Sequence, residues 1–411
     1  MWWHEYLIML RIICFITAMF FLSCSPKLNS ITLDKLDSVT AFEMEAMHNC
    51  NEALYYTPDS LTRIKYIRVN VHFMYDDQGQ NNFTLEEGRQ YMWSLINNAN
   101  KRLLENEKMN LPPGNDTPVI PAAYQYRLHK NDGMDAYYTH KDSELYYYVN
   151  KGKYRNNYNR DIIDKYAIGE DSIINIFVMP HHPDSVATPG YKATGTGIAL
   201  GTSLKMAGLY DNDAPFWSFA TLLNHEVGHI LGLGHSWLKY DRCEDTPPHP
   251  NCWDNNGAPP CDSLFSNNMM DYNASQMAIT PCQLGLIHKG FNKPGSKNRK
   301  LVIRDWCDAD YNRDIIIDKD THWQGARDNV HNITVRSGVE FHIYCRLSMA
   351  AGTKITLEPG ARLYLHDALI HNDCGLSWHG IIVQERKDQK AVVLASDKSR
   401  IENIEPEITL D

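Results

Sequence analysis

The 411-residue sequence lacks a surplus of basic residues, which argues against one broad class of partner. It has 40 Lys and Arg against 50 Asp and Glu, a formal net charge of −10 at pH 7. Nucleic-acid binding needs clustered basic side chains that neutralise phosphates, so we expect no such role. The sequence also lacks an apolar run long enough to cross a bilayer as a mature helix, and its composition is not that of a disordered chain. A globular chain that can hold two domains remains.

The N-terminal residues predict export. Residues 12–22 are almost entirely apolar and follow a basic residue, which indicates a signal peptide over residues 1–23. The run ends in Phe21-Leu22-Ser23-Cys24, which resembles the lipobox of bacterial lipoproteins. We therefore expect a lipid on Cys24 that attaches the protein to the membrane, with the bacterial outer membrane as its location. The alternative is a plain signal peptide and a secreted protein. Residues 24–62 are polar, and we interpret them as a lipid-anchored tether or short pro-segment.

From residue 63 the sequence shows patterns of buried strands and capped helices. Apolar residues fill two strand-length segments, a glycine-flanked segment suits an edge strand, and Thr84 with Glu87 forms a capping box at the start of a long helix. These segments are, in order, Ile64–Phe73 as a strand, Leu85–Glu107 as a helix, Ile173–Met179 as a central strand and Gly195–Gly201 as an edge strand.

A further predicted helix, capped by Asp213 and with Pro215 in its first turn, carries the sequence's most informative motif. His225 and His229 are four residues apart, so both imidazoles face one side of the helix and can bind one ion. His235 can supply a third ligand if the chain turns sharply, and Gly232 allows the left-handed conformation that such a turn needs. Three histidines leave zinc one open position for a water molecule, from which Glu226 can take a proton.

A second motif, Asn268-Met269-Met270-Asp271-Tyr272, lies downstream. With Asp245-Thr246-Pro247, the two motifs resemble the metzincin clan of zinc metallopeptidases, and specifically the pappalysin family, over about residues 63–290. The resemblance implies a catalytic domain, residues 63–295, with a twisted sheet over two long helices. It implies that Met270 packs beneath the metal and that Tyr272 is catalytic, hydrogen-bonding the transition-state oxyanion. For Tyr272, simple core packing is the alternative.

The resemblance also has implications for calcium and for specificity. Family members often bind structural calcium, and Asp245 and Asp271 are candidate ligands, although loop aspartates are more often solvated or turn-forming. Family members often carry a carboxylate next to a cysteine, close behind the second motif, that selects basic substrate side chains. Here Pro281 precedes Cys282 at a longer spacing. A preference for Arg or Lys therefore cannot be assumed.

Eight cysteines lie beyond Cys14 and Cys24, and an even number in an exported protein indicates disulfides. Four of them, Cys243, Cys252, Cys261 and Cys282, resemble the two bridges of the family. Four cysteines allow three connectivities, and by order of appearance we expect the pairs Cys243–Cys261 and Cys252–Cys282. Two hypotheses remain for Cys50, which precedes the catalytic domain. It forms a disulfide with Cys307, Cys345 or Cys374, or its thiolate blocks the metal site as a latency switch.

The C-terminal residues repeat with an offset of 22 residues. Ile333–Ile343 aligns with Ile355–Leu365, with alternating apolar residues on both sides of a shared glycine, and Trp378–Val383 is a partial third copy. Such repeats are typical of a β-solenoid, in which each turn buries its face on the next. Two hairpin strands of a sandwich are the alternative. We expect an all-β domain over residues 296–411, so that the whole chain is of the α+β class.

Together these features predict a zinc-dependent endopeptidase that hydrolyses peptide bonds in proteins or peptides, with Glu226 as the general base acting on a zinc-bound water. The alternative function is that of a surface binding or adhesion lipoprotein that keeps a relic protease domain. The sequence favours the enzyme because the three histidines and Glu226 are all present.

Overall fold

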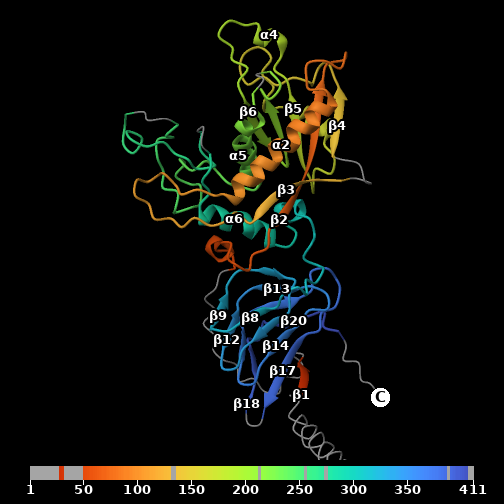
Figure 1. Ribbon diagram of the computed structural model, residues 1–411, viewed down its shortest axis with the longest axis vertical. Helices are drawn as coiled ribbons and strands as arrows, with labels where there is room; N and C mark the ends of the chain where they lie inside the picture. Colours follow the sequence, from red (N-terminus) through yellow and green to blue (C-terminus); the bar gives the residue numbers. More distant parts are fainter. Residues whose placement is uncertain are drawn as a thin grey trace, which may run out of the picture. The chain divides into compact units, whose positions relative to one another are not determined.

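The computed structural model describes residues 27–31 and 50–405, apart from 131–135, 212–213, 254–256, 273–275 and 387–388. The chain divides into two compact units, Asn51–Arg304 and a second unit that joins Asp305 and the residues after it to Cys50 and β1 (Lys27–Ile31). Figure 1 follows the chain through them. The predicted signal peptide and Cys24 lie outside the described residues. Within the described residues, no helix is both long and apolar enough to cross a membrane.

The first unit contains a six-stranded, largely parallel sheet with the order β3-β2-β5-β7-β6, in which β4 also pairs with β2. Every pairing is parallel except that of β6 with β7. The predicted strands are confirmed. Their continuous apolar runs suit central strands that are covered on both faces. The strands are β2 (Lys65–Tyr75), β3 (Tyr124–Leu128), β4 (Tyr137–Lys141), β5 (Ile174–Met179), β6 (Thr196–Leu200) and β7 (Ser203–Ala207).

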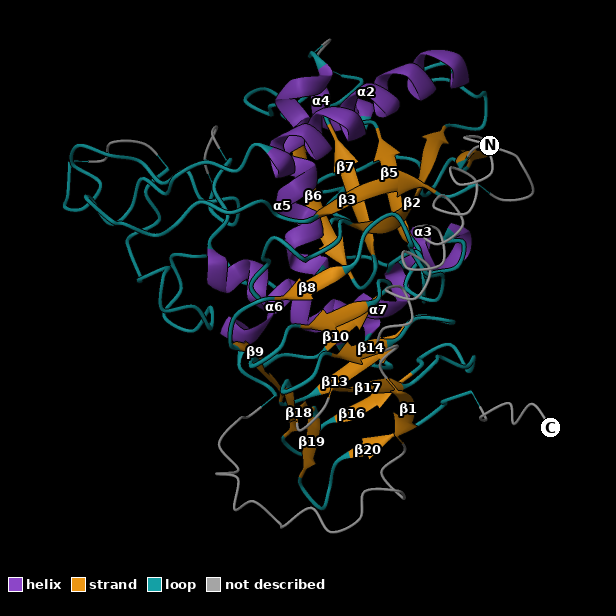
Figure 2. Ribbon diagram, turned by 60° about the horizontal axis from the view of Figure 1, so that its bottom comes forward, coloured by secondary structure: helices purple, strands orange, loops and turns teal. Residues whose placement is uncertain are grey.

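Two helices pack against this sheet beside one another, α2 (Leu85–Leu104) and α5 (Ala220–Ile230) (Figure 2). The capping box of α2 is confirmed, since the Thr84 side chain accepts the Glu87 amide and Glu87 reaches back to Thr84. The predicted start of the second helix is wrong. A 3-10 turn, η3 (Phe216–Phe219), follows Pro215 instead. The Ser218 amide donates to the Pro215 carbonyl, three residues earlier, at 3.0 Å, which is the 3-10 pattern. Asp213 lies outside the described residues.

Helix α6 (Pro281–Asn292) was not predicted, although the sequence carries its signals. Thr280 and Gln283 form a capping box, and Pro281 occupies the first turn, where its missing N–H costs nothing. The remaining short helices of this unit are η2 (Ala53–Tyr56), α3 (Asp161–Tyr166), α4 (Pro183–Val186) and α7 (Lys297–Leu301).

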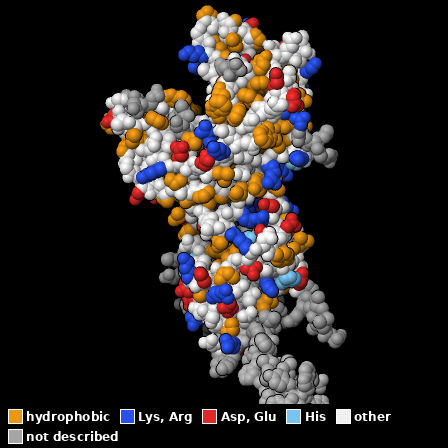
Figure 3. All heavy atoms as spheres, viewed as in Figure 1, with side chains coloured by type: hydrophobic (Ala, Val, Ile, Leu, Met, Phe, Trp, Pro, Cys, Tyr) orange, Lys and Arg blue, Asp and Glu red, His pale blue; other side chains and the backbone are white. Residues whose placement is uncertain are grey.

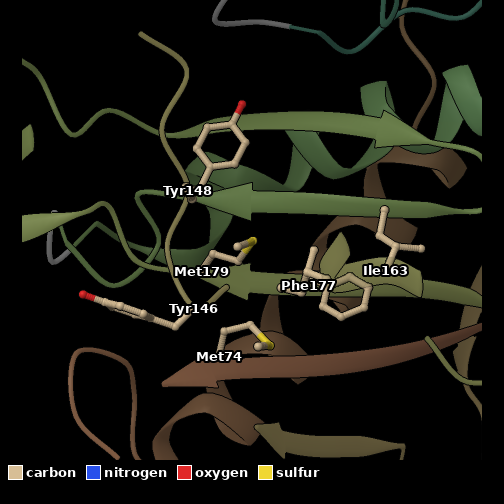
Figure 4. Close-up of a cluster of buried hydrophobic side chains, with 8 residues drawn as sticks. Met74, Tyr146, Tyr148, Ile163, Phe177 and Met179 are labelled. Atoms are coloured by element: carbon tan, nitrogen blue, oxygen red, sulfur yellow. The ribbon is translucent and has the colours of Figure 1, made fainter. Parts of the chain in front are cut away.

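A cluster of large apolar side chains fills one part of the core. Figure 4 shows Met74 from β2 and Phe177 and Met179 from β5 packed with Tyr146 and Tyr148 from the loop before α3. The same cluster includes Ile162 and Ile163 of α3. This packing fixes the loop that carries Tyr148, whose ring borders the candidate site.

In the second unit, every element within the described residues from Asp305 on is a strand, so the predicted all-β region is confirmed. Three parallel sheets contain β8-β11-β14-β17, β9-β12-β15-β19 and β10-β13-β16-β20, and β1 and β18 pair antiparallel with β17. The 22-residue offset is confirmed by the registers Ile333↔Ile355 and Phe341↔Leu363. The hairpin alternative is wrong, because these pairs are parallel. The strands are β8 (Ile315–Ile317), β9 (Thr321–Trp323), β10 (Arg327–Asn329), β11 (Ile333–Val335), β12 (Glu340–Ile343), β13 (Arg346–Met349), β14 (Ile355–Leu357), β15 (Arg362–Leu365), β16 (Leu369–His371), β17 (Ile381–Arg386), β18 (Gln389–Lys390), β19 (Val392–Ala395) and β20 (Arg400–Ile401).

Four disulfides are present, and they correct the predicted pairs. Cys243 bonds Cys282 and Cys252 bonds Cys261, with Cα–Cα distances of 5.6 and 5.3 Å. The prediction followed the order of appearance, whereas the fold closes Cys252–Cys261 within one short loop. Helix α6 brings Cys282 to Cys243, because the Asp245 carboxylate accepts the Cys282 amide at 2.9 Å. In the second unit the pairs are Cys50–Cys345 and Cys307–Cys374.

The disulfide partner of Cys50 bears on the latency hypothesis. A cysteine bonded to Cys345 has no thiolate to offer a metal site. The latency hypothesis is therefore wrong for this disulfide-bonded form, and the alternative, a disulfide to one of the C-terminal cysteines, is the one that the structure contains.

Candidate metal centre and active site

Three imidazoles converge at the end of α5. His225 and His229 lie on the last turns of the helix, and His235 returns to them after Gly232, whose φ of 98° is the left-handed conformation predicted for that residue. Nε2 of His229 lies 3.1 Å from Nε2 of His225 and 3.1 Å from Nε2 of His235. The predicted ligand set is thus assembled around one point.

The opposite ring nitrogens are held by backbone carbonyls. Nδ1 of His225 lies 2.8 Å from the Met269 carbonyl oxygen, and Nδ1 of His229 lies 3.0 Å from that of Leu233. A carbonyl can only accept, so each Nδ1 carries the proton and each Nε2 presents its lone pair toward the shared point. Metal-bound histidines are usually oriented in this way.

This donor set fits a zinc ion. Tetrahedral geometry with Zn–N distances of about 2.0–2.1 Å puts ligand nitrogens about 3.3 Å apart, close to the 3.1 Å between these atoms. Burial lowers the pKa of His225 to about 3 and that of His235 to about 4. Both rings are therefore neutral at pH 7, the form that binds a metal.

Glu226 lies beside the three histidines, buried between α5 and β6. Burial raises its pKa to about 7, while a hydrogen bond from the Ala199 amide acts in the opposite direction. Gly197 of β6 makes this position possible. A Cβ at residue 197 would lie 2.8 Å from Cγ and 3.1 Å from Oε1 of Glu226. The sequence pattern found Glu226, but it did not show that β6 supplies both the space and a donor.

The predicted turn methionine lies directly against α5, the helix that carries His225 and His229. Met270 is fully buried, and a Cβ on Gly228 would meet its sulfur at 2.4 Å. Gly228 thus lets the turn approach α5 between the two ligand positions. The neighbouring Met269 carbonyl, which accepts the proton of His225, comes from the same turn. The second motif therefore both packs against the helix and orients His225.

Tyr272 lies in the cleft beside the histidines. Its ring centroid is 4.8 Å from that of His235 and 5.8 Å from that of His225, and 46% of the residue is exposed. Burial raises the pKa of its hydroxyl, and the charge of Glu226 raises it further. Half-exposed, Tyr272 is not a core residue, which disfavours simple core packing as its role.

The two candidate calcium ligands already accept hydrogen bonds from protein groups. Asp245 accepts the Thr280 hydroxyl at 2.7 Å and the Cys282 amide at 2.9 Å. Asp271 is fully buried and accepts the hydroxyls of Ser236 and Ser266 and a nitrogen of His249 at 3.1 Å. These contacts account for their burial without an ion, and calcium binding stays a prediction.

The site opens into a cleft of about 980 Å³. Four residues of the edge strand β6, Gly197 among them, form one wall. Sequence reasoning missed most of the remaining lining, since nothing in a local pattern brings these segments together. Aromatic and polar side chains predominate there: Tyr148, Asn150, Asn157, Tyr158, Trp217, Ser218, Phe219, Thr221, Trp253 and Gln276, together with Arg102. On the face drawn in Figure 3, basic and acidic side chains are interspersed.

No family model matches the chain, and no curated protein matches it either. Among solved structures it is similar to mature mirolysin of Tannerella forsythia in complex with a cleaved peptide, with 19% identity, 60% of this chain and 97% of that chain covered, and a TM-score of 0.40. It is also similar to mirolysin in complex with a compound, with 18% identity, 59% and 97% coverage and a TM-score of 0.41. A promirolysin mutant from the same organism gives 15% identity, 60% and 85% coverage and a TM-score of 0.41.

Proposed function

We propose that this chain is a zinc-dependent endopeptidase of the metzincin, pappalysin-like type, acting on proteins or peptides. The observation that carries the proposal is the meeting of three histidine Nε2 atoms, 3.1 Å apart in two of the pairs, beside the buried carboxylate of Glu226. Three neutral imidazoles and one base of near-neutral pKa are the groups that metal-assisted hydrolysis requires.

The edge strand β6 supports a peptide as the substrate. It is the last strand on its side of the sheet and lines the cleft. An exposed edge offers backbone donors and acceptors to an extended chain, so a substrate can add to it as a further strand. Such binding places successive peptide bonds past the histidines without depending on one side chain.

Each residue of the site has a role in the proposed reaction. His225, His229 and His235 would hold zinc, which when bound polarises the scissile carbonyl and acidifies a water molecule. Glu226 takes a proton from the attacking water and passes it to the leaving amine. The Ala199 amide orients that carboxylate.

Tyr272 completes the proposed set. Its half-exposed side chain, with the ring beside that of His235, can donate a hydrogen bond from its hydroxyl to the oxyanion as negative charge develops. Met270 keeps the turn against α5, and the Met269 carbonyl keeps His225 in the tautomer that binds a metal.

The alternative, a surface binding protein with a relic protease domain, predicts that the ligands or the base would have been lost. Their burial and ordered hydrogen bonds favour the enzyme. The test is to purify residues 25–411 and measure zinc content and cleavage of a denatured-proteome peptide library. Glu226→Ala should keep about one zinc per chain but lower turnover about 10³-fold or more, because only the base is lost.

Two further variants complete the test. His229→Ala should lose both zinc and activity, whereas Glu244→Ala, which changes an exposed glutamate outside the cleft lining, should lose neither. Near-normal turnover by Glu226→Ala would contradict the mechanism.

We also propose export with a lipid on Cys24 and an outer-membrane location, which rest on the sequence of residues 1–24. The β-solenoid is likewise proposed for the second unit. It is supported by the way successive strands add in turn to three parallel sheets, with a 22-residue offset between β11 and β14 and between β12 and β15.

A further inference from the structure

One basic side chain lies in the cleft. Arg102, half-buried in the last turn of α2, is the only Lys or Arg among the described residues that line it, and Glu226 is the only carboxylate among them. Glu226 has its own role in the proposed reaction, and it lies against Gly197 and accepts a hydrogen bond from the Ala199 amide. The described part of the cleft therefore offers a cation to a substrate but no spare anion.

No carboxylate among the described residues neutralises Arg102. Its Nε donates to Asn98 Oδ1 at 3.1 Å, and one terminal nitrogen contacts the sulfur of Met277, a weak acceptor. Among the described residues, no carboxylate lies within 4.0 Å of its guanidinium. Lys101, on the same helical turn, is paired with Glu105 at 3.8 Å. A guanidinium has five N–H donors in a fork that matches a carboxylate, and most of these are left for a ligand.

The guanidinium is joined to the candidate metal centre by a chain of contacts. Met277, which it contacts, follows Gln276, and the Gln276 amide nitrogen lies 2.9 Å from Nδ1 of the ligand His225. Helix α2 is also joined to α5, because Asn224 donates to the Ala99 carbonyl at 3.2 Å, one turn before Arg102. Arg102 and the three histidines line the same cleft, so a substrate that binds there shares one cavity with both.

We propose that Arg102 selects an acidic side chain, Asp or Glu, at a substrate position that flanks the scissile bond. This proposal rests on the proposed peptidase function and names its substrate class. A carboxylate in the cleft would accept two charge-assisted hydrogen bonds in a partly desolvated place, where an amide of the same size accepts only weaker ones. A basic side chain would instead meet an unpaired positive charge.

The test compares matched peptides that carry Glu, Gln or Lys at each position around the cleaved bond. The wild type should cleave the Glu peptide roughly 10-fold to 100-fold more efficiently than the Gln peptide at one flanking position. Arg102→Gln should bring that ratio of kcat/KM close to one, Arg102→Lys should keep part of it, and Arg102→Glu should favour the Lys peptide. Lys101→Gln, a change on the same turn outside the cleft lining, should keep the wild-type ratio.

A binding measurement separates failure of this proposal from failure of the peptidase function. Short peptide hydroxamates bearing Glu or Gln would be titrated against the zinc-loaded wild type and Arg102→Gln, with zinc content as the check of folding. If no peptide is cleaved but the Glu hydroxamate binds more tightly only when Arg102 is present, the peptidase function fails and the specificity stands. If the Glu-to-Gln ratio is the same in wild type and Arg102→Gln in both assays, Arg102 does not select the substrate.

Discussion

The closeness of Gly197 to Glu226 predicts that a single methyl group will disable this proposed general base. In Gly197→Ala, the added Cβ would lie 2.8 Å from Cγ of Glu226, whereas ordinary contacts begin near 3.4 Å, so Cγ must withdraw by about 0.6 Å. The strand cannot yield easily, because Gly197 pairs with Met206 and Ile198 with Lys205 of β7. Gly197 has no positive φ, so alanine suits its backbone.

The expected effect is mainly on kcat. A misplacement of about 1 Å can cost about 10²-fold in rate, so a shift of this size should lower kcat roughly 10-fold to 100-fold. Zinc content should stay near one per chain because no histidine is touched. The assay is steady-state cleavage of one peptide by the wild type, Gly197→Ala, Glu226→Ala and the double variant. In the Glu226→Ala background Cγ is absent, so Gly197→Ala should add almost nothing.

Two results would refute this reasoning. The first is a kcat for Gly197→Ala within threefold of the wild type, which would mean that the carboxylate moves without consequence. The second is an equal loss in the Glu226→Ala background. That result would show that the methyl group disturbs the strand or the substrate instead of the base.

Three other predictions concern stability, pH and anchoring. Breaking the Cys50–Cys345 disulfide with Cys50→Ala should cost about 2–5 kcal/mol of unfolding free energy, lower the melting temperature and free one titratable thiol; a rise in protease activity instead would revive latency. Burial lowers the pKa of His72 and His140 to about 4. From pH 6.5 down to about 4 the unfolded chain therefore gains protons that the folded chain does not, and the unfolding free energy should fall with pH, by up to about 3 kcal/mol for His72. Urea titrations should show this slope in the wild type and a shallower one in His72→Gln. A fatty-acid analogue should label the wild type and not Cys24→Ala, and a mature N-terminus elsewhere would exclude the lipid anchor.

The parts of the fold predictable from sequence are those fixed by neighbours along the chain. Thr84 and Glu87 satisfy each other's backbone partners within one turn, so a four-residue pattern located the start of α2 correctly. The 22-residue offset also lies between neighbouring segments of the chain, because β11 pairs with β14 and β12 with β15, the next copy of each. The start of α5 was placed too early because a proline permits a helix start, yet it cannot distinguish an α-helical turn from a 3-10 turn.

Features that depend on how distant segments pack together could not be predicted from such local patterns. The pairing of Cys243 with Cys282 depends on where α6 begins relative to Asp245, which no spacing of cysteines records. Arg102 is a similar case. In the sequence it is one of two basic residues at a helix C-terminus, where a cation interacts favourably with the helix dipole. Only the packing of α2 beside α5 makes one of them part of the cleft and leaves Lys101 outside it.

Gly232 shows why the histidine motif was easier to interpret from the sequence than the segments around it. Its left-handed φ turns the chain back at the end of α5, and the Leu233 amide then donates to the Gly228 carbonyl at 2.9 Å. The same turn brings the Leu233 carbonyl to Nδ1 of His229 and delivers His235 to the other side of that ring. One backbone conformation therefore positions His235, the third candidate ligand, and also orients His229, the second. Because only glycine adopts that conformation without strain, the glycine at position 232 reveals in the sequence the turn that the folded site needs.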